Sequence, residues 1–215
     1  MLHCFTQMNF GSSTRKTAVG NLQVIDHPLI EHHLAGLRLQ TTKPSEFRRL
    51  VRRLSTLIAF HATQDLLTKE VDVQTPVAVA RGRKLAQRIA IVPILRAGLG
   101  MVDPIQELIP DAEVWHLGLY RNEETAEPVE YYNRLPQDAP IDVALIVDPM
   151  LATGGSAALA LEKLYGIGVR SCKLLSIISS QPGVDAVLKK YDDVQIYTCV
   201  VDAILNDKKF IVPGL

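Results

Sequence analysis

The stretch Leu145–Ser156, LIVDPMLATGGS, joins a run of apolar residues to a short loop that is rich in glycine. Its apolar part is typical of a strand that is covered on both faces, as the strands of a parallel sheet are. Asp148 stands where this strand would end, and Pro149 restricts the turn that follows. Because ligands of open α/β sheets bind outside the carboxyl ends of the strands, Asp148 is a first candidate for a functional side chain.

The second half of the stretch has the composition of a loop that binds phosphate where a helix begins. Gly154 and Gly155 allow backbone N–H groups to approach an oxyanion, and Thr153 and Ser156 add hydroxyl donors. Taken alone, the loop also fits an ordinary turn into a helix capped by Ser or Thr. The sequence has no GxxxxGK[ST] pattern, which excludes a nucleoside triphosphatase loop. Gly166–Gly168 follows a helical pattern and lacks a third glycine, so it is not a dinucleotide motif.

Short apolar runs alternate with helical patterns over the last two thirds of the chain. The predicted strands are Ile89–Leu95, Val114–Tyr120, Val143–Asp148, Lys173–Ser179 and Val194–Val201. The predicted helices between them are Gly100–Ile109, Ser156–Tyr165 and Val184–Tyr191. This order predicts an α/β fold with a mostly parallel open sheet flanked by helices.

Two helices are predicted before the first of these strands, over Leu29–Leu39 and Pro44–Leu67. One face of the second helix has four arginines, namely Arg48, Arg49, Arg52 and Arg53. We favour a solvated face or a contact between subunits for this row over a ligand-binding patch, because helix surfaces are usually charged. We expect residues 1–22 to be a flexible lead-in and residues 23–215 to form a single domain.

Composition excludes several classes of protein. The 215 residues include 23 lysines and arginines and 23 aspartates and glutamates, so the formal net charge is zero. The chain therefore lacks the positive net charge that would attract nucleic acid or an anionic membrane. Three cysteines at wide spacing predict neither a disulfide framework nor a metal site. No apolar run is long enough to span a membrane, and the N-terminus lacks the apolar core of a secretion signal. We therefore expect a cytoplasmic protein.

The polar segment 121–137, RNEETAEPVEYYNRLPQ, is long for a plain connection between two strands. We interpret it as a protruding hairpin or flap. Such segments act as spacers or as lids, and we favour a lid.

Four separate segments resemble the type I phosphoribosyltransferases. VDPMLATGGS resembles their motif for 5-phosphoribosyl diphosphate (PRPP), and its Pro149 is typical of the uracil phosphoribosyltransferases, because most other relatives have a second acidic residue there. PILRAGLGM (93–101) resembles the loop that binds diphosphate, and GLYRNEETAEP (118–128) matches the segment with a second diphosphate arginine. FIVPGL (210–215) resembles the start of the uracil-binding loop. The resemblance extends from about residue 26 to residue 215.

The resemblance implies a phosphoribosyltransferase of pyrimidine salvage that converts uracil and PRPP to UMP and diphosphate. It implies these PRPP-binding residues: Arg96, Arg121, Asp148, Pro149, Met150, Leu151, Ala152, Thr153, Gly154, Gly155 and Ser156. Asp148 would also be catalytic, and main-chain groups near Ile211, Pro213 and Gly214 would bind uracil. Mg²⁺ is expected to arrive with PRPP, and the resemblance implies a homodimer or a larger homo-oligomer.

Three alternatives follow from the same residues. In the family, the sequence PGL continues into Gly-Asp-Ala-Gly-Asp, so we expect residues 210–215 to form only part of a base pocket. This favours, as the main alternative, a non-catalytic sensor that binds uracil, UMP or PRPP. An RNA-binding regulator on the same fold and an enzyme for another base are the others.

Overall fold

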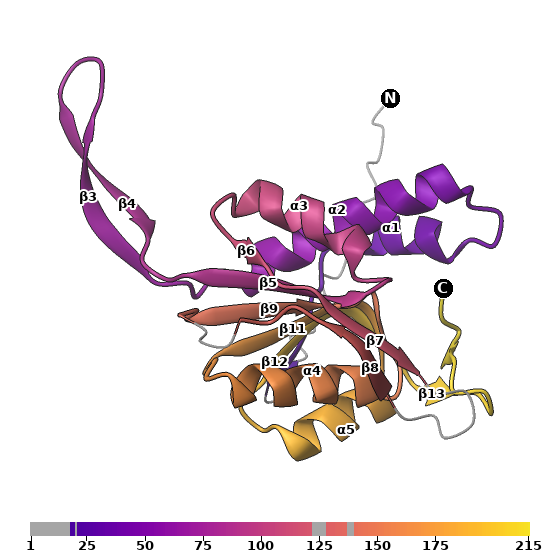
Figure 1. Cartoon of the computed structure of the whole chain (residues 1–215). Helices are drawn as coiled ribbons and strands as arrows, with labels where there is room; N and C mark the ends of the chain where they lie inside the picture. The colour runs from indigo at the N-terminus through magenta and orange to yellow at the C-terminus, as the bar shows by residue number, and fades with distance from the viewer. Residues whose placement is uncertain (1–17, 20, 122–127, 137–139) are drawn as a thin grey trace, which may run out of the picture.

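The computed structural model describes residues 18–19, 21–121, 128–136 and 140–215. Within these residues one large mixed sheet has the strand order β1-β2-β12-β11-β9-β5-β7-β8, with β6 and β10 paired to β5 and β11 (Figure 1). Its strands are β1 (Ala18–Val19), β2 (Leu22–Val24), β5 (Ile89–Leu95), β6 (Glu113–Val114), β7 (Leu117–Arg121), β8 (Pro128–Asn133), β9 (Val143–Val147), β10 (Met150–Leu151), β11 (Cys172–Ser180) and β12 (Gln195–Asp202). The strands from β2 to β7 are parallel, and β1 and β8 add antiparallel edges. The predicted fold class is confirmed.

Side chains from alternate positions of the central strands enter two apolar cores, one on each face of the sheet. In β5, Ile91 belongs to one core, whereas Ala90 and Val92 belong to the other. Every residue of β9 and β11 is buried. These strands are thus covered on both faces, as their near-continuous apolar sequences predicted.

Helices cover both faces of this sheet (Figure 1). The helices are α1 (Pro28–Arg38), α2 (Pro44–Ala62), α3 (Leu99–Leu108), α4 (Gly155–Gly166) and α5 (Gln181–Lys190). The first three lie over one face, and α4 and α5 lie over the other. All five predicted helices are present, with ends that differ by a few residues.

One predicted helix end is wrong. We expected a helix over Pro44–Leu67, but α2 ends at Ala62. The Thr63 hydroxyl donates to the carbonyl of Ala59 at 2.8 Å, and the buried Lys173 ammonium donates to the carbonyl of Ala62 at 2.7 Å. The Ala59 carbonyl also accepts the backbone N–H of Thr63, whereas the carbonyl of Ala62, which a further turn would bond, is satisfied by Lys173 instead, so the helix can stop there.

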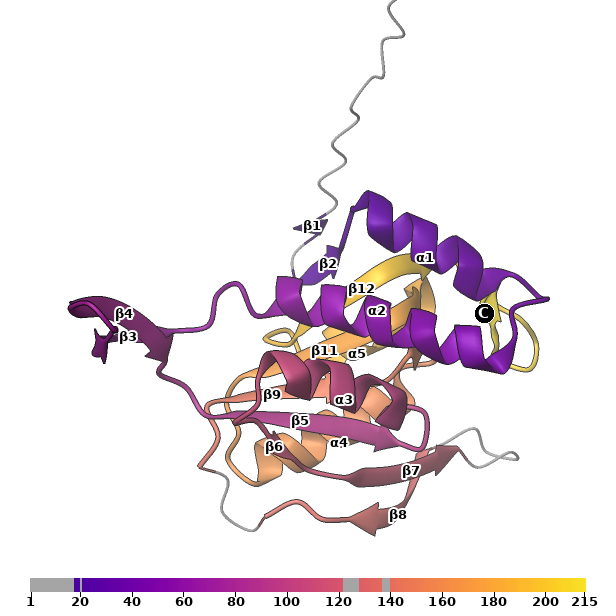
Figure 2. The same cartoon turned by 90° about the horizontal axis from the view of Figure 1, so that it is seen from above.

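A two-stranded arm projects from the body of the protein and was missed by the sequence analysis (Figures 1 and 2). It consists of β3 (Thr68–Gln74) and β4 (Val79–Leu85), which pair only with each other. Most of its residues are exposed, so the arm has no buried face to impose an apolar pattern on its sequence.

Two smaller features frame the site. In the segment interpreted as a hairpin or flap, β8 pairs antiparallel with β7; residues 122–127 and 137 lie outside the described part. A second hairpin near the C-terminus pairs β13 (Ile204–Leu205) with β14 (Ile211–Val212). At the other end, β1 and the first residue of β2 lie within the segment expected to be a lead-in, and both strands join the sheet; residues 1–17 and 20 lie outside the described part. None of the helices described carries an apolar stretch of the length that a membrane span needs.

Candidate active site

Three cavities follow one another along the carboxyl ends of the central strands. The first, of about 100 Å³, lies at the loop between β9 and α4. The second, of about 500 Å³, shares Met150 with the first, and the third, of about 750 Å³, shares Ala97 with the second. Together they form a crevice that extends from the start of α4 to the hairpin of β7 and β8. Parallel sheets place ligands at this edge, as the sequence predicted.

The first cavity brings together most of the predicted PRPP loop. Its lining includes Asp148, Met150, Leu151, Ala152, Thr153, Gly154, Gly155 and Ser156. Pro149 is buried and lines the second cavity instead. The loop therefore encloses a space of phosphate size at the beginning of α4, where backbone N–H groups and the helix dipole favour an anion.

The shape of this loop depends on close contact with the start of α5. Gly154 caps α4 with a φ of 82°, and a Cβ atom there would lie 2.8 Å from the carbonyl oxygen of Gly183. A Cβ atom on Gly183 would lie 2.3 Å from the carbonyl oxygen of Ala152. Ser180 Oγ donates to this same Ala152 carbonyl and accepts from Gly183 N at 2.9 Å. Only glycine fits at both positions, and Ser180 joins the loop to the helix.

Sequence reasoning did not include α5 in the site. The available signal was the sequence SQPG at 180–183, which combines a helix-capping serine with proline in the first turn. That pattern predicts where α5 begins. It does not predict which loop the start of α5 contacts.

Asp148 lies at the end of β9 and lines the first cavity. Its backbone N–H donates to Leu175 in the neighbouring strand at 3.2 Å, and its carboxylate accepts from Met150 N at 3.4 Å. Burial raises the pKa of Asp148 from its ordinary value of 3.8 to about 7, against the smaller lowering effect of the Met150 N–H. The free protein therefore holds a carboxyl group that titrates near neutral pH.

Arg96 follows β5 and lines the third cavity together with Tyr120 and Tyr131 of the β7 and β8 hairpin. Its side chain is exposed, and the peptide bond that precedes it is cis. Gly98, two residues later, packs so closely that a Cβ atom would lie 2.4 Å from the carbonyl oxygen of Val147. The loop that starts at Arg96 is thus placed directly beside the end of β9. Arg121 is the last residue of β7, so its backbone follows Tyr120 at the rim of this cavity.

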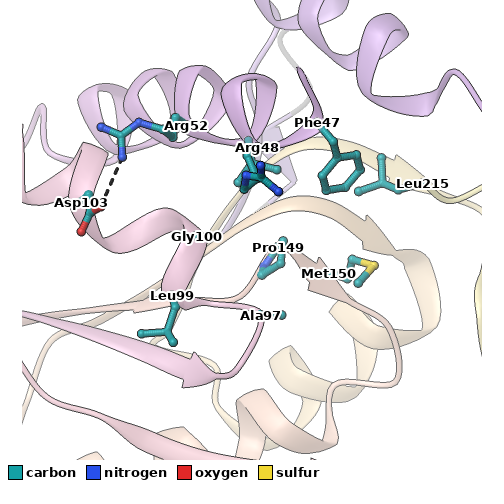
Figure 3. Close-up of a pocket in the computed structure, with 11 residues that line it drawn as sticks. Phe47, Arg48, Arg52, Ala97, Leu99, Gly100, Asp103, Pro149, Met150 and Leu215 are labelled. Atoms are coloured by element: carbon teal, nitrogen blue, oxygen red, sulfur yellow. Dashed lines mark hydrogen bonds and ion pairs between the residues drawn. The ribbon is translucent and has the colours of Figure 1, made fainter. Parts of the chain in front are cut away.

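The second cavity includes residues of α2 that the sequence analysis did not assign to the site. Phe47, Arg48 and Val51 line it opposite Pro149 and Met150. Figure 3 shows Arg48 extending from α2 toward Pro149 and Phe47 facing Leu215. Only long-range folding places α2 here, so no local pattern could have revealed it.

The arginine row on α2 divides into two groups. Arg52 pairs with Glu107 at 2.7 Å and with Asp103 at 3.4 Å, which joins α2 to α3. Two others pair with an acid of their own helix, because Glu46 lies 2.6 Å from Arg49 and 3.9 Å from Arg53. Arg49 and Arg53 fit the favoured interpretation of a charged helix surface, whereas Arg48 and Arg52 both line the second cavity.

The predicted base-binding residues lie on and after β14. Ile211 and Gly214 are buried, Pro213 is exposed, and Gly214 has a φ of 73°. None of these three lines one of the three cavities, but the adjacent Leu215 lines the second. The segment therefore ends at the crevice, beside Phe47 and opposite Met150 (Figure 3).

Comparison with known proteins agrees with the geometry of this crevice. The family model described as uracil phosphoribosyltransferase matches residues 24–215. A uracil phosphoribosyltransferase of Roseiflexus sp. is 49% identical over 197 residues, which is 92% of this chain and 95% of the relative. A uracil phosphoribosyltransferase of Clostridium beijerinckii is 50% identical over 192 residues, with 89% and 92% of the two chains covered.

Solved structures support the same conclusion at the level of the fold. The AQ2163 protein of Aquifex aeolicus superposes with a TM-score of 0.85 at 36% identity, covering 90% of this chain and 93% of its own. The adenine phosphoribosyltransferase of Trypanosoma brucei superposes with a TM-score of 0.57 at 12% identity over 89% and 88% of the two chains, which shows a common fold alone. The family match over nearly the whole described chain confirms the resemblance drawn from the sequence: this protein belongs to the uracil phosphoribosyltransferase family.

Proposed function

We propose that this protein is a phosphoribosyltransferase that transfers the phosphoribosyl group of PRPP to uracil, forming UMP and diphosphate. The observation on which this rests most directly is the crevice, because it aligns the phosphate loop, Asp148 and Arg96 along one edge of the sheet. PRPP has a phosphate at one end, a ribose in the middle and a diphosphate at the other end. This order matches the phosphate loop, Asp148 and Arg96. Membership of the family supports uracil as the acceptor.

The phosphate loop would hold the 5′-phosphate in the first cavity. Backbone N–H groups of the loop and the hydroxyls of Thr153 and Ser156 supply donors there. Fixing this end of the substrate also fixes the position of ribose C1 relative to the acceptor, which reduces the entropic part of the barrier.

Asp148 would act on the sugar. During the reaction the bond between C1 and the diphosphate oxygen breaks, N1 of uracil bonds to C1, and the N1 proton is lost. Positive charge develops on the ribose as the first bond breaks, and an ionised Asp148 that accepts from the ribose hydroxyls stabilises that charge. The group must therefore lose its proton when substrate is bound, although burial favours the protonated form in the free protein.

The leaving diphosphate would be held by arginine. The guanidinium of Arg96 offers paired donors that match phosphate oxygens, and it extends from the loop that packs on the end of β9. We assign Arg121 to the same group by its motif and by its position at the end of β7. The β7 and β8 hairpin is proposed as a lid that excludes water, since hydrolysis of PRPP competes with transfer.

Mg²⁺ is proposed to enter with PRPP. Among the residues that the structure describes, no group of three or more His, Cys, Asp and Glu side chains is arranged to hold a metal ion. The crevice does offer the Asp148 carboxylate beside the proposed ribose position, which fits a metal held mainly by substrate oxygens and water. When bound, the ion would neutralise charge on the diphosphate.

A homo-oligomer is proposed because the arm lacks a partner within the described chain. A two-stranded hairpin is only marginally stable by itself in water, and this arm exposes Val77 and Val79, whose exposed fractions are 95% and 62%. A second copy of the chain would cover these side chains. The arm is a better candidate for this contact than the arginine row of α2, most of which is paired.

The direct test is uracil-dependent formation of UMP by the purified full chain with PRPP and Mg²⁺. We expect turnover with uracil and little with cytosine, because exchange of a carbonyl for an amino group reverses the hydrogen-bond polarity. Binding of PRPP and uracil without any product would overturn the proposal in favour of the sensor. Turnover with a different base alone would overturn the assignment of uracil.

A further inference from the structure

The C-terminal hairpin holds the predicted base-binding residues in a closed loop. The strands pair Leu205 with Ile211 and Ile204 with Val212. Within the turn, Asn206 N donates to the carbonyl of Phe210, and Phe210 N donates back to Asn206 Oδ1, both at 2.9 Å. The Ile211 side chain is buried in the core on the α2 face of the sheet. The hairpin is thus attached to the body at Ile211 and, through a partly buried side chain, at Leu205, while Ile204, Phe210 and Val212 are exposed.

Asp202 closes this loop at its base. It is the last residue of β12, lies just before the hairpin, and is only 6% exposed. Its Oδ2 accepts from the backbone N–H of Gly214 at 3.2 Å, just after the hairpin. Its Oδ1 accepts from Arg38 in the last turn of α1 at 2.7 Å, and the C-terminal end lies near this helix in Figure 2. One carboxylate therefore joins three elements: β12, α1 and the end of the base-binding segment.

The conformation at Gly214 is one that only glycine adopts without strain. With a φ of 73°, Gly214 turns so tightly that a Cβ atom would lie 2.4 Å from the carbonyl oxygen of Ile211. The N–H of Gly214 is engaged by Asp202, so it is not a donor for a ligand. By holding this peptide, Asp202 instead determines the path by which the chain reaches Leu215 at the second cavity.

The ionic partner of Asp202 explains how a carboxylate is tolerated at this depth. Burying an unpaired charge is unfavourable, and Arg38 supplies the opposite charge directly. The pairing also fixes the carboxylate plane, because one oxygen is held by Arg38 and the other is left for Gly214. A freely rotating polar side chain could not direct the Gly214 peptide in the same way.

We propose that Asp202 is a positioning residue that sets the affinity for the base, by holding the main chain from Ile211 to Gly214 in its binding conformation through Gly214 N and Arg38. This inference rests on the proposed function, since it takes that segment as the base-binding one. Asp202 is separate from the phosphate loop and from Arg96, because it lines none of the three cavities. We therefore expect the Asp202 side chain to affect binding of the base more than binding of PRPP.

Kinetics of the full chain with Asp202→Ala test this inference. We expect the KM for uracil to rise about tenfold, the factor that corresponds to about 1.4 kcal/mol for one lost hydrogen bond. The KM for PRPP, and the Kd for PRPP measured by calorimetry without uracil, should change less than twofold. Asp202→Asn retains an oxygen that can accept from Gly214 N, so it should recover much of the uracil affinity. Arg38→Gln keeps Asp202 in place and should give a smaller change of the same kind.

A matched control separates positioning from loss of stability. Asp65→Ala removes the acidic partner of Lys173, a lysine that is only 3% exposed, at a distance from the hairpin in the fold. It should lower the melting temperature and leave both KM values unchanged. If Asp202→Ala does not fold, Asp202→Asn and Arg38→Gln decide the question by the same uracil-specific rise.

The outcomes distinguish this inference from the proposed function. Equal rises of both KM values, an unchanged KM for uracil, or a defect of Asp202→Asn as large as that of Asp202→Ala would each overturn the positioning role. Absence of UMP formation by the wild-type chain would instead overturn the proposed function. A uracil-specific loss that the asparagine variant restores would support both.

Discussion

Replacing Asp148 by asparagine is expected to make the free protein more stable while removing most of its activity. Burial raises the pKa of Asp148 from 3.8 to about 7, so the folded protein binds this proton more tightly than the unfolded chain does. Stability of the wild type therefore falls as the pH rises from about 4 to about 7, and levels off above that range. A pKa change from 3.8 to about 7 corresponds to about 4 kcal/mol at most. Because part of the side chain is open to the crevice, we expect about 2 to 4 kcal/mol.

The assay combines denaturation with kinetics. Urea unfolding of the wild type and Asp148→Asn is measured without ligand at pH 4, 6 and 8. The two proteins should be nearly equally stable at pH 4, and the variant should gain stability relative to the wild type as the pH rises. At pH 8 its turnover number should be lower by 10² or more, because a charge that stabilises the transition state has been removed. Asp111→Asn, at an exposed aspartate outside the crevice, should change neither quantity.

Three results would contradict this prediction. Equal stability of the wild type and Asp148→Asn at pH 8 would show that the carboxylate is well solvated in the free protein. Unchanged turnover would show that Asp148 does not stabilise charge on the ribose. If Asp148→Asn is both less stable and less active than the wild type at pH 8, the Asp148 carboxylate makes a stabilising contact in the folded protein. Its burial would then not lower the stability.

Three further predictions concern separate parts of the crevice and the arm. Arg96→Ala should raise the Kd for PRPP about tenfold or more in calorimetry and alter uracil binding less, and equal losses would contradict its diphosphate assignment. Gly183→Ala should lower kcat/KM for PRPP about 10²-fold, because the new methyl group displaces the carbonyl of Ala152 and with it the phosphate loop. A kcat/KM equal to that of the wild type would contradict the close packing of Gly183 on the loop. Replacing Val77 and Val79 together by aspartate should reduce the mass in solution measured by light scattering, and an unchanged assembly would exclude the arm as the contact.

The parts of the fold that sequence predicted well are those that depend on local pattern. The strand that ends just before Asp148 has both faces buried, so its apolar run is continuous, and the glycines after it mark the turn into α4. The predicted limits of β5 are those observed. The error in the end of α2 lay where the controlling contact is distant, because Lys173 in β11 donates to the carbonyl of Ala62.

The features that the sequence did not predict are of two kinds. Some depend on tertiary contacts, and the arm makes too few such contacts to have an apolar pattern. The arm has no buried face, so its strands lack the apolar pattern by which strands were recognised. Arg48 and Phe47 enter the crevice because α2 packs beside α3, whereas the pattern of α2 alone shows Arg48 as one of a row of surface arginines and Phe47 as part of the apolar face. In the sequence, Asp202 is likewise only an acidic residue at the end of a strand. Its role depends on its contacts with Arg38 of α1 and with Gly214 after the hairpin.

The crevice is held from outside at two places. The phosphate loop keeps its shape because Ser180 and Gly183 of another segment contact Ala152, and the segment from Ile211 to Gly214 is held by Asp202. Both anchors lie where neighbouring strands end, since Ser180 of β11 pairs directly with Asp202 of β12. A shift between these two strands would therefore displace the phosphate end and the base end of the site together. Because both strands are buried and packed in the centre of the sheet, such a shift is resisted, and the spacing between the two ends of the site follows from the register of the sheet.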